Sequence, residues 1–486
     1  MGERGITDPF PKGCLGSERC RIPAILTTPR GTLVAASDAR WAHGQDTAGN
    51  LETMVARSTD NGLTWERQFV HHFEDVVDGS QRCIYSAGFI DPVLGCDREG
   101  TLYLLADMTP AYVGTFAYDG IVCGRESGRH SNGKLALKAG QDISRGENVE
   151  LNEDTYPYYV GEADGNGYAP VLCIRDHTPY EGYLVDEQMY LYRQGTDGVE
   201  KVMIPQLDGE GRPTDHMVHG NVFFAAAPLK VYPTFHIVCS ISRDDGRTWS
   251  AFRSISSQFS QGGFVGVCPG RGISYVPEGA DGLEAAGPER MIFPIYDNCR
   301  GVEYASAIYT EDQGNTWKRS SYADQTGFRQ SGEIIKSSES QVVELPGGIL
   351  RMYSRNQVDR IGYTESLDGG ETWGPYYMEE QLPYCGNCMI SVIRYSRRID
   401  GKVVLVASYP GGDGELYHRV NGIIAVGFYD ETEGKVDWRH HYQVNQAPYY
   451  YSCLTEFADG RIGLLYEYEE YAMRLEVYEM EEIMEA

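Results

Sequence analysis

The sequence predicts an all-β fold, a six-bladed β-propeller, on three observations. An octapeptide with the pattern Ser/Thr-x-Asp-x-Gly-x-Thr-Trp occurs four times. Six other segments have the pattern of a strand, a turn with Gly and a second strand. Gly supplies 57 of the 486 residues, and this share exceeds the average of about 7% and favours tight turns and short strands.

The octapeptides lie at 58–65, 242–249, 310–317 and 366–373. Each predicts a hairpin turn in which the Asp accepts hydrogen bonds from backbone N–H groups. The Gly takes a positive φ at little cost, and the Trp packs between neighbouring sheets. The four Asp residues are therefore predicted to hold turns and not to act in catalysis: Asp60, Asp244, Asp312 and Asp368.

The six strand–turn–strand segments span 21–40, 91–107, 273–297, 339–355, 388–410 and 451–469. Apolar residues alternate around their turns, as in hairpins. A chain of this length exceeds most single cores, so it holds either several domains or one repeat architecture. Six hairpins with octapeptide turns between them favour six four-stranded blades around a central axis, spanning residues 1–486.

The spacing of the octapeptides predicts an insertion. Asp312 follows Asp244 by 68 residues and Asp368 follows Asp312 by 56, but Asp244 follows Asp60 by 184. We place the surplus at 115–225, where short strand and turn patterns predict a small β-rich insertion within the propeller. The last segment, 469–486, fits either a short acidic helix or a terminal strand.

The charge of the chain excludes several classes of partner. With 70 acidic and 42 basic residues, the formal net charge is −28, which argues against nucleic acid or an anionic membrane surface. An anionic ligand would need a local cluster of Arg. No run of about 18 apolar residues predicts a membrane-spanning helix. The first residues lack the apolar segment of a signal peptide, so we expect a cytoplasmic protein, or a secreted one if the native chain begins earlier.

The twelve Cys residues give no metal pattern. Only Cys385 and Cys388 form a C-x-x-C pair, and no second pair completes a zinc site. We expect free thiols in a reducing compartment, with a disulfide such as Cys14 to Cys20 as the alternative. No metal and no other cofactor is predicted.

Polar residues stand at the open ends of the predicted hairpins. In an antiparallel hairpin, the first residue of one strand lies beside the last residue of the other, far from the turn. If the hairpins are equivalent elements of the blades, their open ends gather on one rim of the propeller. The residues at these ends are Arg21, Arg40, Asp91, Glu339, Arg355 and Tyr451.

Four motifs give the chain a resemblance to a known family. They are RIPA at 21–24, the octapeptide or Asp-box repeat, ESQVVEL at 339–345, and YSCL with DGRIGLLYE within 451–467. Together they resemble the bacterial exo-sialidases of glycoside hydrolase family 33, over nearly the whole chain. Residues 223–250 and the predicted insertion are similar to the clostridial-type large sialidases, some relatives of which release an anhydro sugar by intramolecular transfer. The resemblance implies the sialidase form of the propeller and sialylated glycans as partners.

The resemblance also implies roles for single residues. Arg21, Arg355 and Arg419 match the arginine triad that grips the sialic acid carboxylate, which suits planar guanidinium groups. Tyr451, directly before the Ser of YSCL, matches the nucleophile, and Glu339 matches the base that activates it. The anomeric carbon bears a carboxylate, so a neutral Tyr avoids the repulsion that an Asp or Glu nucleophile would meet.

Three further residues complete the implied site. Asp46, on a loop six residues beyond Arg40, matches the acid/base that protonates the leaving oxygen and then activates water. Arg40 is expected to contact the O4 region of the sugar, and Asp91 the O4 or N-acyl side.

Three functions stay open at this point. The first is a retaining exo-α-sialidase. The second is an enzyme in which the sugar's own hydroxyl, or another sugar, attacks the same intermediate. The third is a glycan-binding propeller without turnover. The sequence also leaves open the linkage, the choice between N-acylated and deaminated sialic acid, and the oligomeric state.

Overall fold

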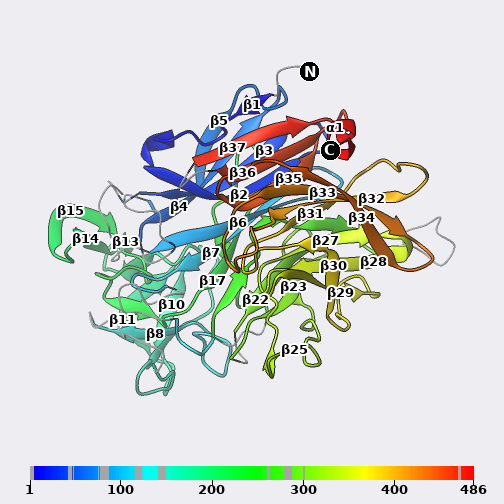
Figure 1. The fold of residues 1–486 in the computed structure, drawn as a ribbon. Helices are drawn as coiled ribbons and strands as arrows, with labels where there is room; N and C mark the ends of the chain where they lie inside the picture. The colour runs from blue at the N-terminus through cyan, green and yellow to red at the C-terminus, as the bar shows by residue number, and fades with distance from the viewer. Residues whose placement is uncertain are drawn as a thin grey trace.

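The structure is a computed structural model that describes residues 5–41, 46, 49–74, 76, 87–114, 123–140, 149–259, 263–277, 287–298, 301–468 and 472–485. Six β-sheets lie around a common centre (Figure 1). The predicted all-β propeller with six blades is confirmed.

The first three blades come from the first two-thirds of the chain. Blade 1 consists of β2 (Arg19–Thr27), β3 (Leu33–Arg40), β4 (Leu51–Ser58) and β5 (Glu66–His71). Blade 2 consists of β6 (Gly88–Cys96), β7 (Leu102–Thr109), β17 (His236–Ser242) and β18 (Arg253–Ser254), with β20 (Gly270–Arg271) parallel to β6. Blade 3 consists of β19 (Val265–Val267), β21 (Ile273–Tyr275), β22 (Arg290–Asp297), β23 (Tyr304–Thr310) and β24 (Lys318–Arg319).

The last three blades complete the ring. Blade 4 consists of β27 (Ser340–Leu345), β28 (Ile349–Ser354), β29 (Arg360–Ser366) and β30 (Tyr377–Pro383). Blade 5 consists of β31 (Ser391–Arg394), β32 (Val403–Pro410), β33 (Gly422–Asp430) and β34 (Lys435–Gln443). Blade 6 consists of β35 (Tyr449–Glu456), β36 (Ile462–Tyr468), β37 (Ala472–Tyr478) and β1 (Ile6–Thr7).

Blade 6 joins the two ends of the chain. The N-terminal β1 pairs with β37, with Ile6 opposite Glu476. The described chain ends in α1 (Met480–Met484), so the last segment holds both a terminal strand and a short helix. Strands β1 and β37 and helix α1 all lie at the top of Figure 1.

Further strands lie between β7 and β17 of blade 2. One sheet contains β8 (Ala136–Ala139), β9 (Tyr158–Val160), β10 (Ala169–Cys173), β11 (Pro179–Val185), β12 (Leu191–Gln194), β13 (Val199–Lys201) and β16 (Leu229–Val231). The hairpin of β14 (Met203–Leu207) and β15 (Pro213–His219) follows β13. These strands lie beside the ring at the lower left of Figure 1. An insertion bounded at 115 and 225 stays a prediction, and its residues 115–122 and 141–148 lie outside the described ones.

Three short elements complete the description: the hairpin of β25 (Arg329–Gln330) and β26 (Glu333–Ile334), and the 3-10 helices Cys14–Gly16 and Pro346–Gly348.

The blades stack face to face, which explains their composition. Strands β3, β4, β7, β22, β23 and β32 are buried at every position. A strand covered on both faces reads as nearly continuous apolar residues, because neither face meets water. A polar residue buried in such a strand therefore needs a partner inside the protein.

The octapeptides form the predicted turns between the third and fourth strands of blades 1 to 4. In the first, Asp60 Oδ1 accepts from the N–H of Thr64 (2.9 Å), and the Ser58 hydroxyl accepts from the N–H of Gly62 (2.9 Å). Gly62 has a φ of 84°. In each of the other three turns, the backbone N–H of the Thr likewise donates to the Asp carboxylate.

The six predicted hairpins are present, and three inner strands, β2, β6 and β35, have a register shift near their open ends. Arg19 pairs with Arg40 and Arg21 with Asp38, so β2 starts two residues before the predicted opening residue. The register then shifts between Arg21 and Ala24, where Ile22 has a φ of 62°. Such bulges re-aim neighbouring side chains.

The ten described Cys residues are all free, including Cys14 and Cys20. Cys83 and Cys299 lie outside the described residues. Among the described helices, none is long and apolar enough to cross a membrane.

Candidate active site

A pocket of about 320 Å³ lies at the open ends of the hairpins. Seven of the eight predicted site residues line it: Arg21, Asp46, Asp91, Glu339, Arg355, Arg419 and Tyr451. The eighth, Arg40, is fully buried beside it and contacts Asp46. The structure thus brings together residues up to 430 positions apart, counted from Arg21 to Tyr451.

Tyr451 and Glu339 are in direct contact. Tyr451 Oη donates to Glu339 Oε1 at 2.5 Å. Arg355 Nη1 donates both to Glu339 Oε2 and to Tyr451 Oη, each at 2.7 Å. Burial holds the pKa of Tyr451 well above its usual value, with Glu339 adding to that rise and Arg355 opposing it. The phenol is therefore neutral at rest, and it has a carboxylate in place to take its proton.

Arg21 is oriented by the buried carboxylate of Glu467, which is not among the predicted site residues. Glu467 Oε1 accepts from Arg21 Nε (3.2 Å) and from the N–H of Ile22 (2.8 Å), and Glu467 Oε2 accepts from Arg21 Nη2 (3.3 Å). Glu467 thus fixes both the guanidinium plane and the bulged backbone beside it. Its signal in the sequence is a charged residue inside the apolar run of β36.

Arg355 and Arg419 share one bracing residue, Asn387. Asn387 Oδ1 accepts from Arg355 Nε (3.2 Å), and its carbonyl accepts from Arg419 Nη2 (2.6 Å). Asn387 has a φ of 52°, which Asn tolerates better than most residues. Arg419 also lies over the Tyr451 ring, with its guanidinium carbon 5.7 Å from the ring centre.

Asp46 lies between two arginines. Its Oδ1 accepts from Arg40 Nη1 (2.7 Å) and from Arg21 Nη1 (3.2 Å), and its side chain is 44% exposed. Burial raises the pKa of Asp46, but Arg40 and Arg21 outweigh that effect and hold it at about 2. Arg40 is itself fixed by Asp38 Oδ2 (2.8 Å), in a pair that is fully buried.

Asp91 lies next to the buried side chain of Asp38. Its N–H donates to Asp38 Oδ1 (3.1 Å), and its φ is 62°. Burial, together with the nearby Asp38 and Glu339, raises the pKa of Asp91 well above the usual range. Asp91 is therefore suited to donate a hydrogen bond as a neutral acid.

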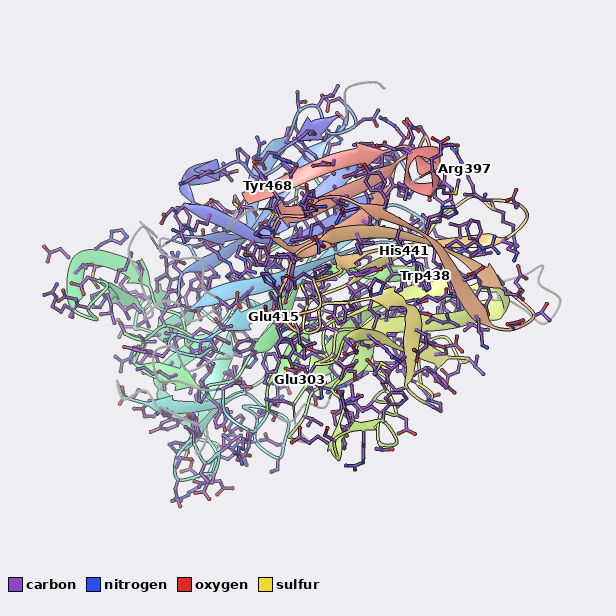
Figure 2. The ribbon with its side chains drawn as sticks, in the orientation of Figure 1. Glu303, Arg397, Glu415, Trp438, His441 and Tyr468 are labelled. Atoms are coloured by element: carbon purple, nitrogen blue, oxygen red, sulfur yellow. The ribbon has the colours of Figure 1, made fainter. Side chains whose placement is uncertain are left out.

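The rest of the pocket has an apolar wall and an open side. The wall is formed by Ile90, Phe235, Phe264 and Tyr296, which belong to one buried cluster. On the open side a wider groove of about 900 Å³ shares Asn298, Glu303 and Asn387 with the pocket. Figure 2 labels Glu303, in the lower middle of the view.

No group of three or more His, Cys, Asp or Glu side chains within the described ranges could hold a metal ion.

Known proteins share this sequence and fold. Residues 222–464 match the family model of the BNR repeat-like domain. The chain is 30% identical over 482 residues to the anhydrosialidase of Macrobdella decora, covering 92% of this chain and 57% of that protein. It is 27% identical over 479 residues to sialidase B of Streptococcus pneumoniae, and this match covers 92% of this chain and 61% of that protein. The chain thus spans about three-fifths of the length of these curated relatives.

Two solved structures align over almost the whole chain. The intramolecular trans-sialidase of Ruminococcus gnavus, in complex with oseltamivir carboxylate, has a TM-score of 0.79 and 31% identity, with 96% of each chain covered. The leech intramolecular trans-sialidase, in complex with 2,7-anhydro-Neu5Ac, also has a TM-score of 0.79, with 28% identity and 96% of this chain and 69% of that chain covered. The narrower likeness to clostridial-type enzymes stays a prediction. The repeats, the propeller and these matches together show that the chain belongs to the sialidase family, of the glycoside hydrolase family 33 type.

Proposed function

We propose that the protein is a retaining exo-α-sialidase that cleaves terminal sialic acids from sialylated glycans through a Tyr451-linked intermediate. The observation that carries the proposal is the bond of 2.5 Å between Tyr451 Oη and Glu339 Oε1, within a pocket that also holds three arginines and Asp46. A nucleophile in contact with its base supports an enzyme over a glycan-binding propeller, because binding alone needs no such pair.

The substrate carboxylate binds Arg21, Arg355 and Arg419. All three Arg21 nitrogens already donate to carboxylates, and Nη1 donates to Asp46. The incoming carboxylate replaces Asp46 at this nitrogen. Losing part of its cationic surroundings raises the pKa of Asp46, so that it can carry the proton that the leaving oxygen needs.

In the first step, Tyr451 Oη attacks the anomeric carbon as its proton passes to Glu339. The bond to the leaving oxygen breaks, and Asp46 gives that oxygen a proton. In the second step, Asp46 takes a proton from water, which attacks the anomeric carbon. The bond to Tyr451 breaks and its oxygen recovers the proton from Glu339. Two inversions give net retention.

A second outcome for the same intermediate is favoured by the relatives. The proteins that align over more than nine-tenths of this chain include an anhydrosialidase and two intramolecular trans-sialidases. In this version a hydroxyl of the bound sugar replaces water in the second step, and the product is an anhydro sugar.

Two measurements test these proposals in order. The purified chain should release the fluorophore from an aryl α-sialoside, and no release at any mildly acidic to neutral pH would contradict the proposed cleavage. The mass of the first product from a sialyl-lactose then separates the two outcomes. Free sialic acid indicates hydrolysis, whereas a product lighter by one water indicates intramolecular transfer.

A further inference from the structure

Two buried acids beside the catalytic pocket make the same contact between neighbouring blades. Glu467 lies on the second strand of blade 6 and accepts from the N–H of Ile22, on the innermost strand of blade 1 (2.8 Å). Asp38 lies on the second strand of blade 1 and accepts from the N–H of Asp91, on the innermost strand of blade 2 (3.1 Å). Ile22 and Asp91 both line the pocket, and both have a φ of 62°. Each acid therefore holds a pocket residue of the next blade in an unusual backbone conformation.

Asp107 makes this contact one blade further around the ring. It lies on β7, the second strand of blade 2, and is fully buried. Its Oδ1 and Oδ2 both accept from the N–H of Val267 (3.2 and 3.1 Å), on β19, the innermost strand of blade 3. Burial raises the pKa of Asp107 well above its usual range, with the bond from Val267 opposing that rise and Asp38 adding to it.

The position of Asp107 is costly for an acid. Every residue of β7 is buried, and no Lys or Arg among the described residues forms an ion pair with Asp107. A carboxyl group in such surroundings lowers stability relative to an apolar side chain, unless its hydrogen bonds compensate. The proposed reaction does not use Asp107, so its role has to follow from what it contacts.

The carboxyl group of Asp107 and two rings of the apolar wall converge on Gly266. A Cβ at this position would lie 2.8 Å from Phe264 Cζ, 3.0 Å from Tyr296 Cε1 and 3.2 Å from Asp107 Oδ2. Phe264 directly precedes β19, and Tyr296 pairs with Gly266 across blade 3. The two rings are T-shaped, with centres 5.3 Å apart, and both line the catalytic pocket. Asp107 thus holds the strand from which this wall is built.

We propose that Asp107 is a positioning residue, which fixes the apolar wall of the catalytic pocket by holding Val267 of the next blade. The proposed reaction uses neither Phe264 nor Tyr296, so a displaced wall weakens binding of the sugar equally before and during the reaction. KM then rises while kcat stays the same. The inference rests on the proposed function, because it assumes that a sialic acid occupies this pocket.

Binding of a dehydrated sialic acid analogue to the full chain tests the proposal. Calorimetry gives Kd, and an aryl α-sialoside gives KM and kcat. Asp107→Leu keeps the branched shape of the side chain but removes both acceptor oxygens. We expect it to raise Kd and KM roughly tenfold and to change kcat by less than about twofold. Asp107→Asn keeps one acceptor oxygen, so its Kd should stay within about threefold of that of the unaltered protein.

Asp245→Gly is the control, because Asp245 also joins two blades but at the turn end of the strands. Its carboxylate accepts from the hydroxyls of Thr28 (2.8 Å) and Thr32 (2.5 Å), in the turn of the first hairpin. Asp245 has a φ of 64°, which Gly adopts easily. Asp245→Gly should lower Tm, as Asp107→Leu should, but leave Kd and KM unaltered.

Two results would overturn the proposal: a lower Tm with an unaltered Kd in Asp107→Leu, or equal weakening in Asp107→Asn and Asp107→Leu. If Asp107→Leu fails to fold, Gly266→Ala gives the answer, because its methyl group pushes the wall away from Asp107. A raised Kd in that variant supports the proposal, and an unaltered Kd overturns it.

Failure of the proposed function gives a different result. An unaltered protein that binds the analogue without turnover contradicts the proposed cleavage, whereas Kd still tests Asp107. An unaltered protein that does not bind the analogue overturns both.

Discussion

Tyr451 donates a hydrogen bond of 2.5 Å to Glu339, although the two residues are 112 positions apart and come from different blades. Tyr451 lies on β35 of blade 6, and Glu339 directly precedes β27 of blade 4. The contact exists because the inner strands of a closed propeller converge on one axis. A phenol with a raised pKa and a base in contact with it can transfer its proton as it attacks.

Tyr451→Phe removes the proposed nucleophile while keeping most of the packing. We expect kcat for an aryl α-sialoside to fall by roughly 10³-fold or more, with an unchanged circular dichroism spectrum. Tyr450→Phe, one residue earlier in the same strand, is the matched control and should retain turnover. Equal losses in both variants would contradict the assignment of Tyr451.

Asp46→Asn removes the proposed acid. A good leaving group needs little protonation, so the loss should depend on the aglycone. We expect kcat/KM to fall by roughly 10²–10⁴-fold for a sialyl-lactose and by much less for a nitrophenyl sialoside. Parallel assays of the two substrates measure this, and an equal loss for both would exclude Asp46 as the acid.

Asn387→Gly tests whether Asn387 positions the arginines. Gly keeps the positive φ but removes the acceptor for Arg355 Nε. We expect roughly tenfold weaker binding of a dehydrated sialic acid analogue, as lost hydrogen bonds to charged groups imply. An analogue without the carboxylate should bind as before.

The matched control is Asn61→Gly, which changes another Asn of positive φ in an octapeptide turn. It should leave the affinity for both analogues unaltered. Equal weakening for the two analogues in Asn387→Gly would indicate a structural role only.

We expect acidic pH to destabilise the fold because of two buried histidines, His71 and His236. Both are buried, and their ring nitrogens have no hydrogen-bond partner among the described residues. Burial lowers the pKa of each from 6.5 to about 3, with His72 and Arg129 adding to the effect. Below pH 6.5 the unfolded chain binds protons that the fold excludes, so the free energy of unfolding falls until pH approaches 3.

The expected slope is about 1.4 kcal/mol per pH unit for each His. Urea unfolding at a series of pH values measures it. Replacement by Phe at either position should flatten the slope, whereas His216→Gln, at an exposed position, should not. An unaltered slope in both Phe variants would contradict the role of these residues.

Much of this architecture is visible in the sequence because it repeats. The octapeptides and the Gly-centred hairpins predicted the blades. The ends of the hairpins and the family motifs indicated which residues line the pocket. The role of Asn387 could not be predicted, because it depends on a turn conformation and on contacts with two arginines from other segments of the chain. The roles of Asp38 and Glu467 could not be predicted either. Both residues lie inside buried strands, where a break in the apolar pattern is their only sign in the sequence.

The most direct test of the account is the identity of the residue that carries the trapped sugar. A sialosyl fluoride with a second fluorine beside the anomeric carbon slows breakdown of the intermediate. Peptide mass spectrometry after denaturation should then find the sugar on Tyr451. A sugar on Glu339 or Asp46, or complete turnover of the reagent with no labelled peptide, would contradict the central claim.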